Sequence, residues 1–343
     1  MNTTPPEASS LAAEPLPSGE AAAGRHLKRQ ENDLGYDVIG DIHGHYEKLL
    51  ALLQTLGYRK RDGAFRHPLG RQAVFLGDLI DRGPLQEEVL NTVRDMVQAG
   101  SGLCIMGNHE WNAIGYATPI GGGEYGKARN DKNLKHHHVF LDQVGLDTPR
   151  HRAWVEWFKT LPPFLDLGGI RVAHACWRHA QIDTIRAGMH EGRLTERFLA
   201  DSFVKKPVPT AARRAMDLIT KGPEVKLPDG AVFHDHEGTP RDDIRLRWWD
   251  EAARTYRNAA MVPTLQMKNI PDMPLPEDVV MGTDSEVPVL AGHYWLSGRP
   301  GVRNGKVAVL DFSAAANGPL VAYRWDGETV LSDDKLVAVG GWY

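Results

Sequence analysis

A short apolar run, a glycine-containing polar segment and a helical stretch follow one another three times in the first half of the chain. The apolar runs begin at Tyr36, Gln72 and Gly102, and the polar segments after them read GDIHG, GDLIDRGP and GNHE. The stretch HYEKLLALLQTLGY, for example, spaces its leucines like one face of a helix. Successive strand–loop–helix units predict an α/β fold with a largely parallel sheet, in which ligands bind beyond the carboxyl ends of the strands.

Further apolar runs predict more strands later in the chain: IRVAHACW, VPVLAGHYW, KVAVLDFSA and PLVAYRWDGE. The segment HRAWVEWFKTLP has helical spacing, and we expect its bulky residues to form the buried face: Trp154, Trp157, Phe158 and Leu161. The pattern weakens at about 182–281, where charges and prolines increase. We expect an insertion or lid there.

The length of 343 residues allows one large domain or two ordinary ones. Residues 1–34 are rich in Pro, Ser, Ala and Glu without apolar periodicity, which predicts a disordered leader before a domain at 35–343. The leader has no long apolar run, so we expect no signal peptide. Because no stretch approaches the roughly 18 consecutive apolar residues of a membrane span, we expect a cytoplasmic protein without a membrane partner.

The composition, with 42% hydrophobic and 24% charged residues, is that of a globular protein. The formal net charge of −4 gives no basic field, so we expect no nucleic-acid partner. There are 15 histidines but only two cysteines, Cys104 and Cys176. A reducing compartment fits this content, and a metal site would use His, Asp, Asn and Glu.

Polar side chains directly follow five of the predicted strands: Asp41 and His43, then Asp78, Asp81 and Arg82, then Asn108 and His109, then His174, and finally His293. Oxygen donors mixed with imidazoles suit Mn, Fe or Zn better than Ca or Mg. Each motif alone could be a simple turn, and His174 alone could be an ordinary core residue. Five polar clusters at strand ends are hard to explain as turns.

These motifs, in this order, resemble the calcineurin-like metallophosphoesterases. The resemblance is to the phosphoprotein phosphatase group and its bacterial relatives, which include diadenosine tetraphosphatases of the ApaH and PrpE kinds. It runs from about Tyr36 to Trp325. It implies a four-layer αββα sandwich with two central mixed β-sheets and a dinuclear metal site at the strand ends.

The resemblance also implies a set of metal ligands. It places Asp41 and His43 on a first metal ion, and Asp78 as a bridge between the two ions. The second ion would take Asn108, His174 and His293. The implied cofactor is a pair of metal ions, for which we favour Mn²⁺ over Fe or Zn. A water or hydroxide between them would have a lowered pKa and would attack phosphorus in line.

Catalytic roles follow from the same resemblance. His109 would protonate the leaving oxygen, and Asp81 would orient its imidazole. Arg82 would grip two phosphate oxygens, and Asn108 would add its amide group. Glu110 is expected to brace the site rather than react. The alternative for Asp81 and Arg82 is a simple surface ion pair.

The substrate class is left between three hypotheses. In GHYW, Trp295 stands where many nucleases of this superfamily have a second histidine, which favours the phosphatase branch. We expect hydrolysis of a phosphomonoester, in a phosphorylated small molecule, a nucleotide or a phosphoprotein. The alternative is a symmetrical bis(5'-nucleosyl)-tetraphosphatase. A more remote one is a non-catalytic regulatory module that binds nucleotides.

Insertions are expected to set the specificity. The glycine-hinged loop at about 120–138 carries Arg129, which could contact substrate, or it could be a solvated loop. In the second insertion Arg245 and Arg247 precede two tryptophans, which together could form a phosphate clamp and a stacking surface. Of these two arginines we name Arg247 as a substrate ligand. The run His136 to His138 is not expected to bind a metal, because consecutive helical side chains point in different directions.

Overall fold

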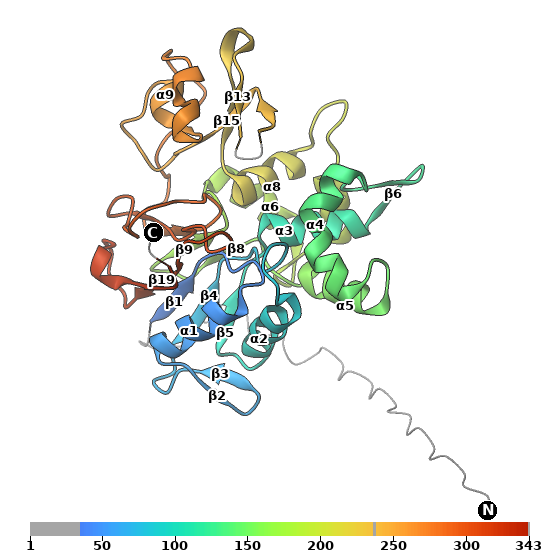
Figure 1. Cartoon of the computed structure of the whole chain (residues 1–343), viewed down its shortest axis with the longest axis vertical. Coiled ribbons are helices and arrows are strands. Elements are labelled where there is room, and N and C mark those ends of the chain that lie inside the picture. The colour runs from blue at the N-terminus through green and yellow to red at the C-terminus, as the bar shows by residue number, and fades with distance from the viewer. Residues whose placement is uncertain (1–34, 236–237, 342–343) are drawn as a thin grey trace, which may run out of the picture.

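Two mixed β-sheets stacked face to face form the centre of the molecule in this computed structural model (Figure 1). The structure describes residues 35–235 and 238–341. The leader predicted for residues 1–34 lies outside the described residues.

The first sheet has the strand order β20-β19-β1-β4-β5 among the described residues. Its bounds are β1 (Tyr36–Ile39), β4 (Gln72–Phe75), β5 (Gly102–Cys104), β19 (Leu320–Trp325) and β20 (Leu336–Val339). β1, β4 and β5 are parallel, as the three strand–loop–helix units predicted. β19 pairs antiparallel with β1, which makes the sheet mixed.

The second sheet has the order β18-β17-β9-β8. Its strands are β8 (Phe164–Asp166), β9 (Arg171–Ala173), β17 (Val289–Ala291) and β18 (Val307–Val309). β17 is parallel to both of its neighbours, whereas β8 and β9 are antiparallel. The carboxyl ends of β9 and β17 therefore lie at the same edge of this sheet.

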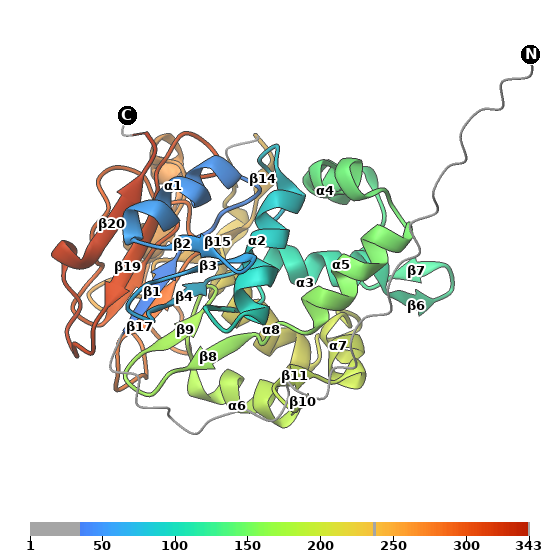
Figure 2. The same cartoon turned by 90° about the horizontal axis from the view of Figure 1, so that it is seen from below.

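Helices cover the outer faces of the two sheets. α1 (Tyr46–Leu56) and α2 (Gln86–Gln98) lie on the first sheet, and α6 (His179–Ala187) and α8 (Ala211–Lys221) lie beyond the second (Figure 2). α1 buries one face, formed by Leu49, Leu52, Leu53 and Leu56. The order helix, sheet, sheet, helix confirms the predicted αββα sandwich.

One large hydrophobic core connects the layers. It contains strand residues of both sheets, such as Val38, Phe75, Val172 and Leu290, each with no exposed surface. Burial of a side chain of this size stabilises the fold by roughly 1.5–3 kcal/mol. A core continuous through both sheets holds their strand ends in fixed relative positions.

The remaining described elements lie around this sandwich. The helices are α3 (Asn108–Ala117), α4 (Asp131–Val144), α5 (Pro149–Lys159), α7 (Glu196–Ser202) and α9 (Tyr256–Ala259), with short 3₁₀ turns at Pro228–Gly230, Thr264–Asn269 and Asp333–Lys335. The small sheets are β2 (Arg59–Arg61) with β3 (Ala64–Arg66), β6 (Pro119–Gly121) with β7 (Glu124–Tyr125), β10 (Met189–His190) with β11 (Arg193–Leu194), β13 (Phe233–His234) with β14 (Pro240–Arg241), and β12 (Glu224–Lys226) with β15 (Asp243–Leu246) and β16 (Ala260–Met261).

The predicted insertion at about 182–281 consists of two structurally different parts. Its first part packs on the main core through Ile182, Phe198 and Met216. Its second part has a smaller core of its own, formed by Leu227, Phe233, Ile244, Leu246, Ala253, Tyr256, Ala259, Ala260 and Ile270. α9, β13 and β15 of this part lie at the top of Figure 1, above α8. A lid function for the segment stays a prediction.

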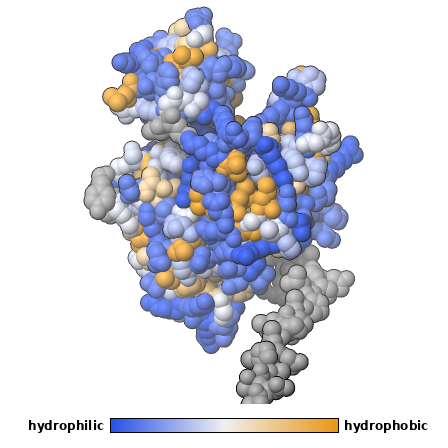
Figure 3. Space-filling model, turned by 45° about the vertical axis from the view of Figure 1, so that its right-hand side comes forward, coloured by the Kyte–Doolittle hydropathy of each residue, from blue (hydrophilic) through white to orange (hydrophobic). Residues whose placement is uncertain are grey.

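The face of the molecule drawn in Figure 3 is mostly hydrophilic, with hydrophobic residues gathered in a few patches. This distribution agrees with the burial of the large apolar side chains in the two cores. None of the described helices has both the length and the apolar composition needed to cross a membrane.

Candidate metal centre and catalytic site

The six predicted metal ligands all lie just beyond strand ends. Asp41 and His43 follow β1, and Asp78 follows β4. Asn108 is the first residue of α3 after β5, while His174 and His293 follow β9 and β17. The two sheets thus contribute residues far apart in sequence to one place, as the motifs predicted.

Unusual backbone geometry shapes these loops. His43 and Asp78 have φ angles of 49° and 48°, and Asp81 and His293 have φ angles of 88° and 72°. Residues other than glycine adopt positive φ rarely and at an energetic cost, and such residues concentrate at functional sites. The sandwich therefore holds these side chains in conformations that a free loop would disfavour.

Two glycines allow the loops to approach each other closely. A Cβ atom on Gly107 would lie 2.3 Å from Asp78 Oδ1, and one on Gly292 would lie 2.0 Å from Asp41 Oδ1. Any other residue at either position would displace a carboxylate. The glycines of GNHE and AGHY are thus required by the carboxylates beside them.

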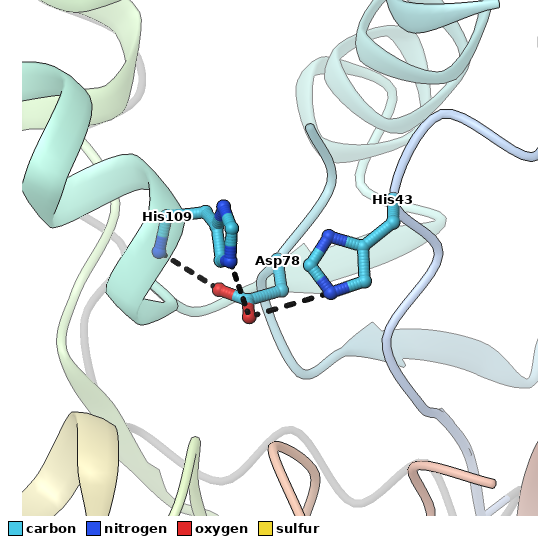
Figure 4. A group of neighbouring side chains, drawn as sticks. All are labelled: His43, Asp78 and His109. Carbon is cyan, nitrogen blue, oxygen red and sulfur yellow. Dashed lines mark hydrogen bonds and ion pairs between the residues drawn. The ribbon is translucent and has the colours of Figure 1, made fainter. Parts of the chain in front are cut away.

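Asp78 lies at the centre of the site. Its Oδ2 atom is 3.3 Å from His174 Nε2, 3.6 Å from His43 Nε2 and 3.8 Å from His109 Nε2. Figure 4 shows His43 and His109 approaching this carboxylate from two different segments. Asp78 belongs to two groups of possible metal ligands, one with His43 and His109 and one with His174 and His293, and within each group the ligand atoms lie within 4.8 Å of one another. A carboxylate shared by two groups has the position that a bridging ligand needs.

Asp41 and Asn108 complete the cluster. Asp41 Oδ2 accepts the backbone N–H of His293 at 2.9 Å, which joins the loops of the two sheets. Asn108 Oδ1 lies 3.1 Å from His174 Nε2. The structure therefore brings all six predicted ligands together.

The imidazoles are oriented with Nε2 toward the centre. His43 Nδ1–H donates to the carbonyl of Ile80 at 2.6 Å, and His174 Nδ1–H donates to the carbonyl of Leu76 at 2.7 Å. A carbonyl can only accept, so in the neutral imidazoles these bonds fix the tautomer whose Nε2 lone pair can bind a cation. Among the described residues, His43 Nε2, His293 Nε2 and Asp41 Oδ1 are buried without a hydrogen-bond partner.

The buried negative charge of the site favours the binding of cations. Burial raises the pKa of Asp41 well above its usual value, and the carboxylate of Asp311 raises it further. Burial opposes protonation of His174, but the carboxylates of Asp78 and Asp41 outweigh this effect and raise its pKa to about 10. Both shifts reflect buried negative charge without enough positive charge beside it. Together with the unpartnered donor atoms, they show that the residues fit metal ions, and the mixed oxygen and imidazole donors suit Mn, Fe or Zn.

His109 is held by two carboxylates. Its Nδ1 lies 2.6 Å from Asp81 Oδ2, and its backbone N–H donates to Asp78 Oδ1 at 2.9 Å. Burial would lower the pKa of His109, but the nearby Asp78 and Asp81 raise it above its usual value. The imidazole is thus kept ready to carry a proton, with Nε2 facing the cluster. Asp81 is buried beside His109, which is not the arrangement of a surface ion pair.

Arg82 lines a cavity beside the cluster. Its guanidinium lies 5.3 Å from the ring centroid of the half-exposed Trp295, and its Nε is buried without a hydrogen-bond partner among the described residues. The cavity has a volume of about 320 Å³ and also exposes Asn108, His109 and His293. No carboxylate of the described residues pairs with this guanidinium, which is therefore available to an anionic ligand.

Five basic residues also line this cavity: Lys127, Lys132, Lys221, Arg241 and Arg245. We call these five residues the basic wall. A larger, more open hollow of about 740 Å³ near Trp249 and Lys306 contains none of the predicted site residues. The smaller cavity is therefore the one relevant to the chemistry.

The two further substrate ligands suggested by the sequence lie elsewhere. Arg129 donates to both carboxylate oxygens of Asp147, at 2.7 and 2.8 Å, and Arg247 donates to the carbonyl of Asn258. The described residues that line the cavity include Arg245 but neither of these arginines. The structure thus gives no support to Arg129 or Arg247 as substrate ligands.

The proposed stacking surface of Trp248 and Trp249 is wrong. Trp248 has no exposed surface and donates its indole N–H to the carbonyl of Ala175, and Trp249 is 6% exposed and packs on Tyr294. Their apolar area serves the core.

Two residues that contribute to the site were not predicted from the sequence. Asp311 accepts the N–H groups of Trp295 and Ser313 beside the site, and its position after the apolar run VAVL was the same signal as for the ligands. His137, from the histidine run, lies 2.7 Å from Asp81 Oδ1 through its Nδ1. Nothing in the local sequence distinguished it from its two neighbours.

Glu110 braces the ligand loops, as expected. Its carboxylate accepts three backbone N–H groups, from Asp78 and Gly107 at 2.9 Å and from Leu79 at 2.8 Å. It thereby ties the loop after β4 to the start of α3.

The sequence model of the Calcineurin-like phosphoesterase family matches residues 36–257, more than half of the chain. The match includes every candidate ligand except His293.

Two bacterial relatives are similar over a short stretch. The asymmetrical bis(5'-nucleosyl)-tetraphosphatase PrpE of Halalkalibacterium halodurans is 45% identical over 74 residues, which is 22% of this chain and 30% of the relative. The protein of the same name from Bacillus subtilis is 45% identical over 76 residues, 22% of this chain and 31% of the relative. The matches thus span about 30% of the length of these relatives.

Solved structures are similar over most of the chain at low identity. A putative diadenosine tetraphosphatase is 16% identical with a TM-score of 0.43, covering 90% of this chain and 95% of the other. A protein serine/threonine phosphatase from Saccharomyces cerevisiae, with similarity to human phosphatase PP5, is 15% identical with a TM-score of 0.45, covering 91% and 80%.

Proposed function

This chain belongs to the calcineurin-like phosphoesterase family, and on that premise we propose that it is a metal-dependent phosphohydrolase. The observation that carries the proposal is the position of Asp78. Its Oδ2 lies 3.3 to 3.8 Å from three imidazole nitrogens, in a buried cluster that contains unpartnered donor atoms. We propose that the cluster holds two metal ions, for which we favour Mn²⁺ over Fe or Zn.

Each ligand has a proposed place. Asp41 and His43 would hold one ion, Asn108, His174 and His293 would hold the other, and Asp78 would be shared between them. Two such ions would activate a water molecule at neutral pH and withdraw charge from the phosphate.

The side chains around the cluster perform the other tasks. Arg82 binds phosphate oxygens through its free guanidinium, and the Asn108 amide assists. His109 gives the proton of Nε2 to the leaving oxygen, because Asp81 and Asp78 favour its protonated form. Asp81 fixes the direction of the imidazole.

Metal dependence is the first test. The full chain is stripped with a chelator, reloaded with Mn²⁺, Fe²⁺ or Zn²⁺, and assayed for bound metal and for hydrolysis of p-nitrophenyl phosphate. We expect about two ions per chain and activity only in the loaded protein. Activity that survives complete removal of the metal would overturn the proposal. Nucleotide binding without turnover by the loaded protein would favour a regulatory module instead.

The basic wall favours a second candidate substrate over a simple phosphomonoester. Lys127, Lys221 and Arg245 line the same cavity as Arg82. Lys221 pairs with Asp217 and Arg245 pairs with Glu224, but the Nε of Arg245 is buried without a hydrogen-bond partner among the described residues. One phosphate group needs only the metal ions and Arg82. Further cations at the same cavity suit a substrate with several phosphates, such as a dinucleoside polyphosphate.

The names of the relatives bear on how such a substrate would be cut. Both are called asymmetrical tetraphosphatases, so we do not favour the symmetrical alternative that the sequence suggested. We propose an asymmetrical cut as the second candidate.

Product analysis separates the candidates. The metal-loaded chain is incubated with diadenosine tetraphosphate, a phosphopeptide and a small phosphomonoester under identical conditions. AMP and ATP as products support the asymmetrical cut, whereas two molecules of ADP contradict it. Phosphate release from the phosphopeptide or the small ester alone would restore the phosphomonoester hypothesis. A cytoplasmic location stays a prediction.

A further inference from the structure

Asp81 is hydrogen-bonded to two histidines at once. Its Oδ2 lies 2.6 Å from His109 Nδ1, and its Oδ1 lies 2.7 Å from His137 Nδ1. A carboxylate can only accept here, so both ring nitrogens donate. His109 comes from α3 beside the metal ligands, whereas His137 comes from the middle of α4.

Among the described residues, no other hydrogen bond reaches this carboxylate. Asp81 is 5% exposed, and its backbone N–H donates to Gln86 Oε1 at 2.7 Å. Burial would raise the pKa of Asp81, but His137 and His109 outweigh it and hold the pKa below its usual value. The carboxylate is therefore an anion whose plane is set by the two imidazoles.

His137 itself is fixed in place. Its side chain is 7% exposed, and its ring lies 5.3 Å from the rings of both Tyr116 and Phe140. Because rings on two sides limit its rotation, the ring offers its N–H in one direction.

A second contact ties α4 to the same loop. Gln143, near the end of α4, accepts the backbone N–H of Gln86 at 2.9 Å and donates to the carbonyl of Pro84 at 2.6 Å. α4 thus contacts the loop between β4 and α2 at Asp81 and again at Pro84 and Gln86. Gln86, which holds the Asp81 backbone, is held in turn by Gln143.

We infer that His137 is a positioning residue for the proton transfer: it holds the Asp81 carboxylate so that its other oxygen keeps His109 aimed at the leaving group. This inference rests on the proposed function. In the step concerned, a hydroxide oxygen derived from water bonds to phosphorus as the P–O bond to the leaving group breaks, and the leaving oxygen keeps the electron pair of the broken bond. That oxygen takes the proton of His109 Nε2, and a neutral imidazole remains.

The inference gives the insertion a role in the chemistry. α4 belongs to the segment between GNHE and the strand β8, which contributes no metal ligand. Through His137 it acts on the proton donor while the metal ligands stay on the sandwich. A change in α4 would therefore alter the proton transfer without altering metal binding.

The test compares two leaving groups. p-Nitrophenolate departs without a proton, whereas the alkoxide of glycerol phosphate needs one, so weakened proton transfer slows the alkyl ester selectively. We use the full metal-loaded chain and three variants. His137→Phe keeps the ring but removes the N–H, and His137→Asn keeps an N–H close to the position of Nδ1. His151→Phe is the matched control, because His151 is also buried and packs on Phe140, but contacts Asp147 rather than Asp81.

For His137→Phe we expect kcat on glycerol phosphate to fall about 10- to 100-fold, the usual effect of losing such an outer partner. On p-nitrophenyl phosphate the fall should stay below about threefold, with KM and metal content unchanged. His137→Asn should restore most of the alkyl activity, and His151→Phe should treat the two esters as the wild type does. If His137→Phe does not fold, His137→Leu takes its place, since leucine suits a helix well.

Three results would overturn the inference: an equal fall for both esters, an effect on KM alone, or no effect. The first would mean a structural role, and the second a direct contact with substrate. Failure of the proposed function is distinguishable, because the wild type would then hydrolyse neither ester in a metal-dependent way.

Discussion

The ligand loops bury carboxylates beside the cavity, whereas the basic wall lines the cavity with cations. The loops contribute carboxylates that are almost fully buried, such as Asp41 and Asp78. The wall contributes cations that are half-buried or exposed, such as Lys127 and Lys221. The loops follow strands of the two central sheets, whereas Lys127 lies in the segment between α3 and α4 and Lys221 is the last residue of α8. From this difference we propose that the sandwich sets the reaction and that the basic wall influences which anion binds.

Among changes in the ligand loops, Asp78→Asn should reduce activity and metal binding the most. The amide leaves one acceptor oxygen where three imidazole nitrogens converge, so the bridging position is lost. We expect activity on p-nitrophenyl phosphate to fall by more than about 100-fold, beyond the usual effect of an outer partner, with bound metal reduced. Asp62→Asn is the control, because Asp62 also has a positive φ, of 50°, but lies exposed on a hairpin turn. An active Asp78→Asn protein with full metal content would contradict the role of the loops.

Glu110→Gln should give the second largest effect, because it removes a carboxylate that holds the ligand loops in place. Three backbone N–H groups point at the carboxylate, and the NH₂ group of glutamine would face at least one of them. We expect metal affinity to fall about 10- to 100-fold and the free energy of unfolding to fall by about 1–3 kcal/mol. Metal titration and thermal unfolding measure these, with the exposed Glu47→Gln on α1 as control. Unchanged metal affinity would show that the loops hold their shape without this brace.

The ligand loops could be predicted from the sequence because their geometry is local. Asp41, Asp78 and His293 each follow an apolar run that ends at a known edge of a sheet. Parallel strands bring such ends together whatever the intervening chain does. The same logic would have found Asp311, which follows β18 in the same way.

The wall and its helix could not be predicted in this way. His137 meets Asp81 across 56 residues, from a helix whose placement depends on packing rather than on a motif. Arg247 follows the last residue of β15, where the chain leaves the strand, so strand alternation could not give its direction. Trp248 and Trp249 supply core volume, which a sequence cannot distinguish from a binding surface. The sequence therefore did not predict where side chains outside the two sheets point.

In the basic wall, Lys127→Gln should have an intermediate effect, which concerns the binding of substrate. We expect KM for diadenosine tetraphosphate to rise about tenfold, the value of one charge-assisted contact. KM for p-nitrophenyl phosphate should not change. Lys60→Gln, on the exposed β2 hairpin, is the control. A rise in both KM values would mean that Lys127 contributes to the reaction itself, and the division between loops and wall would be lost.

Lys127 also predicts a pH dependence. Burial first, and the neighbouring Lys221 and Lys205 next, lower its pKa to about 7. Because the lysine is charged below its pKa, the wall loses positive charge as the pH rises through about 7. The ratio of KM for the tetraphosphate to KM for the monoester should therefore rise between about pH 6 and pH 8. Lys127→Arg stays charged and should abolish this rise, and a ratio that does not change with pH in the wild type would refute the assignment.

Arg129→Gln should give the smallest effect, although Arg129 lies two residues from Lys127 in the same insertion. Its guanidinium is already used by Asp147 and by the carbonyl of Tyr116, so it has little left for a substrate. We expect kcat/KM for both substrates to change by less than about twofold. The free energy of unfolding should fall by no more than about 1 kcal/mol, because the pair with Asp147 is partly solvated. Arg129→Gln and Lys127→Gln each replace one basic side chain in the same insertion. A difference between them therefore depends on the position of the side chain and not on the charge of the insertion. If Arg129→Gln raised KM for the tetraphosphate as much as Lys127→Gln does, the effect would come from the net charge of the insertion and not from a wall with defined members.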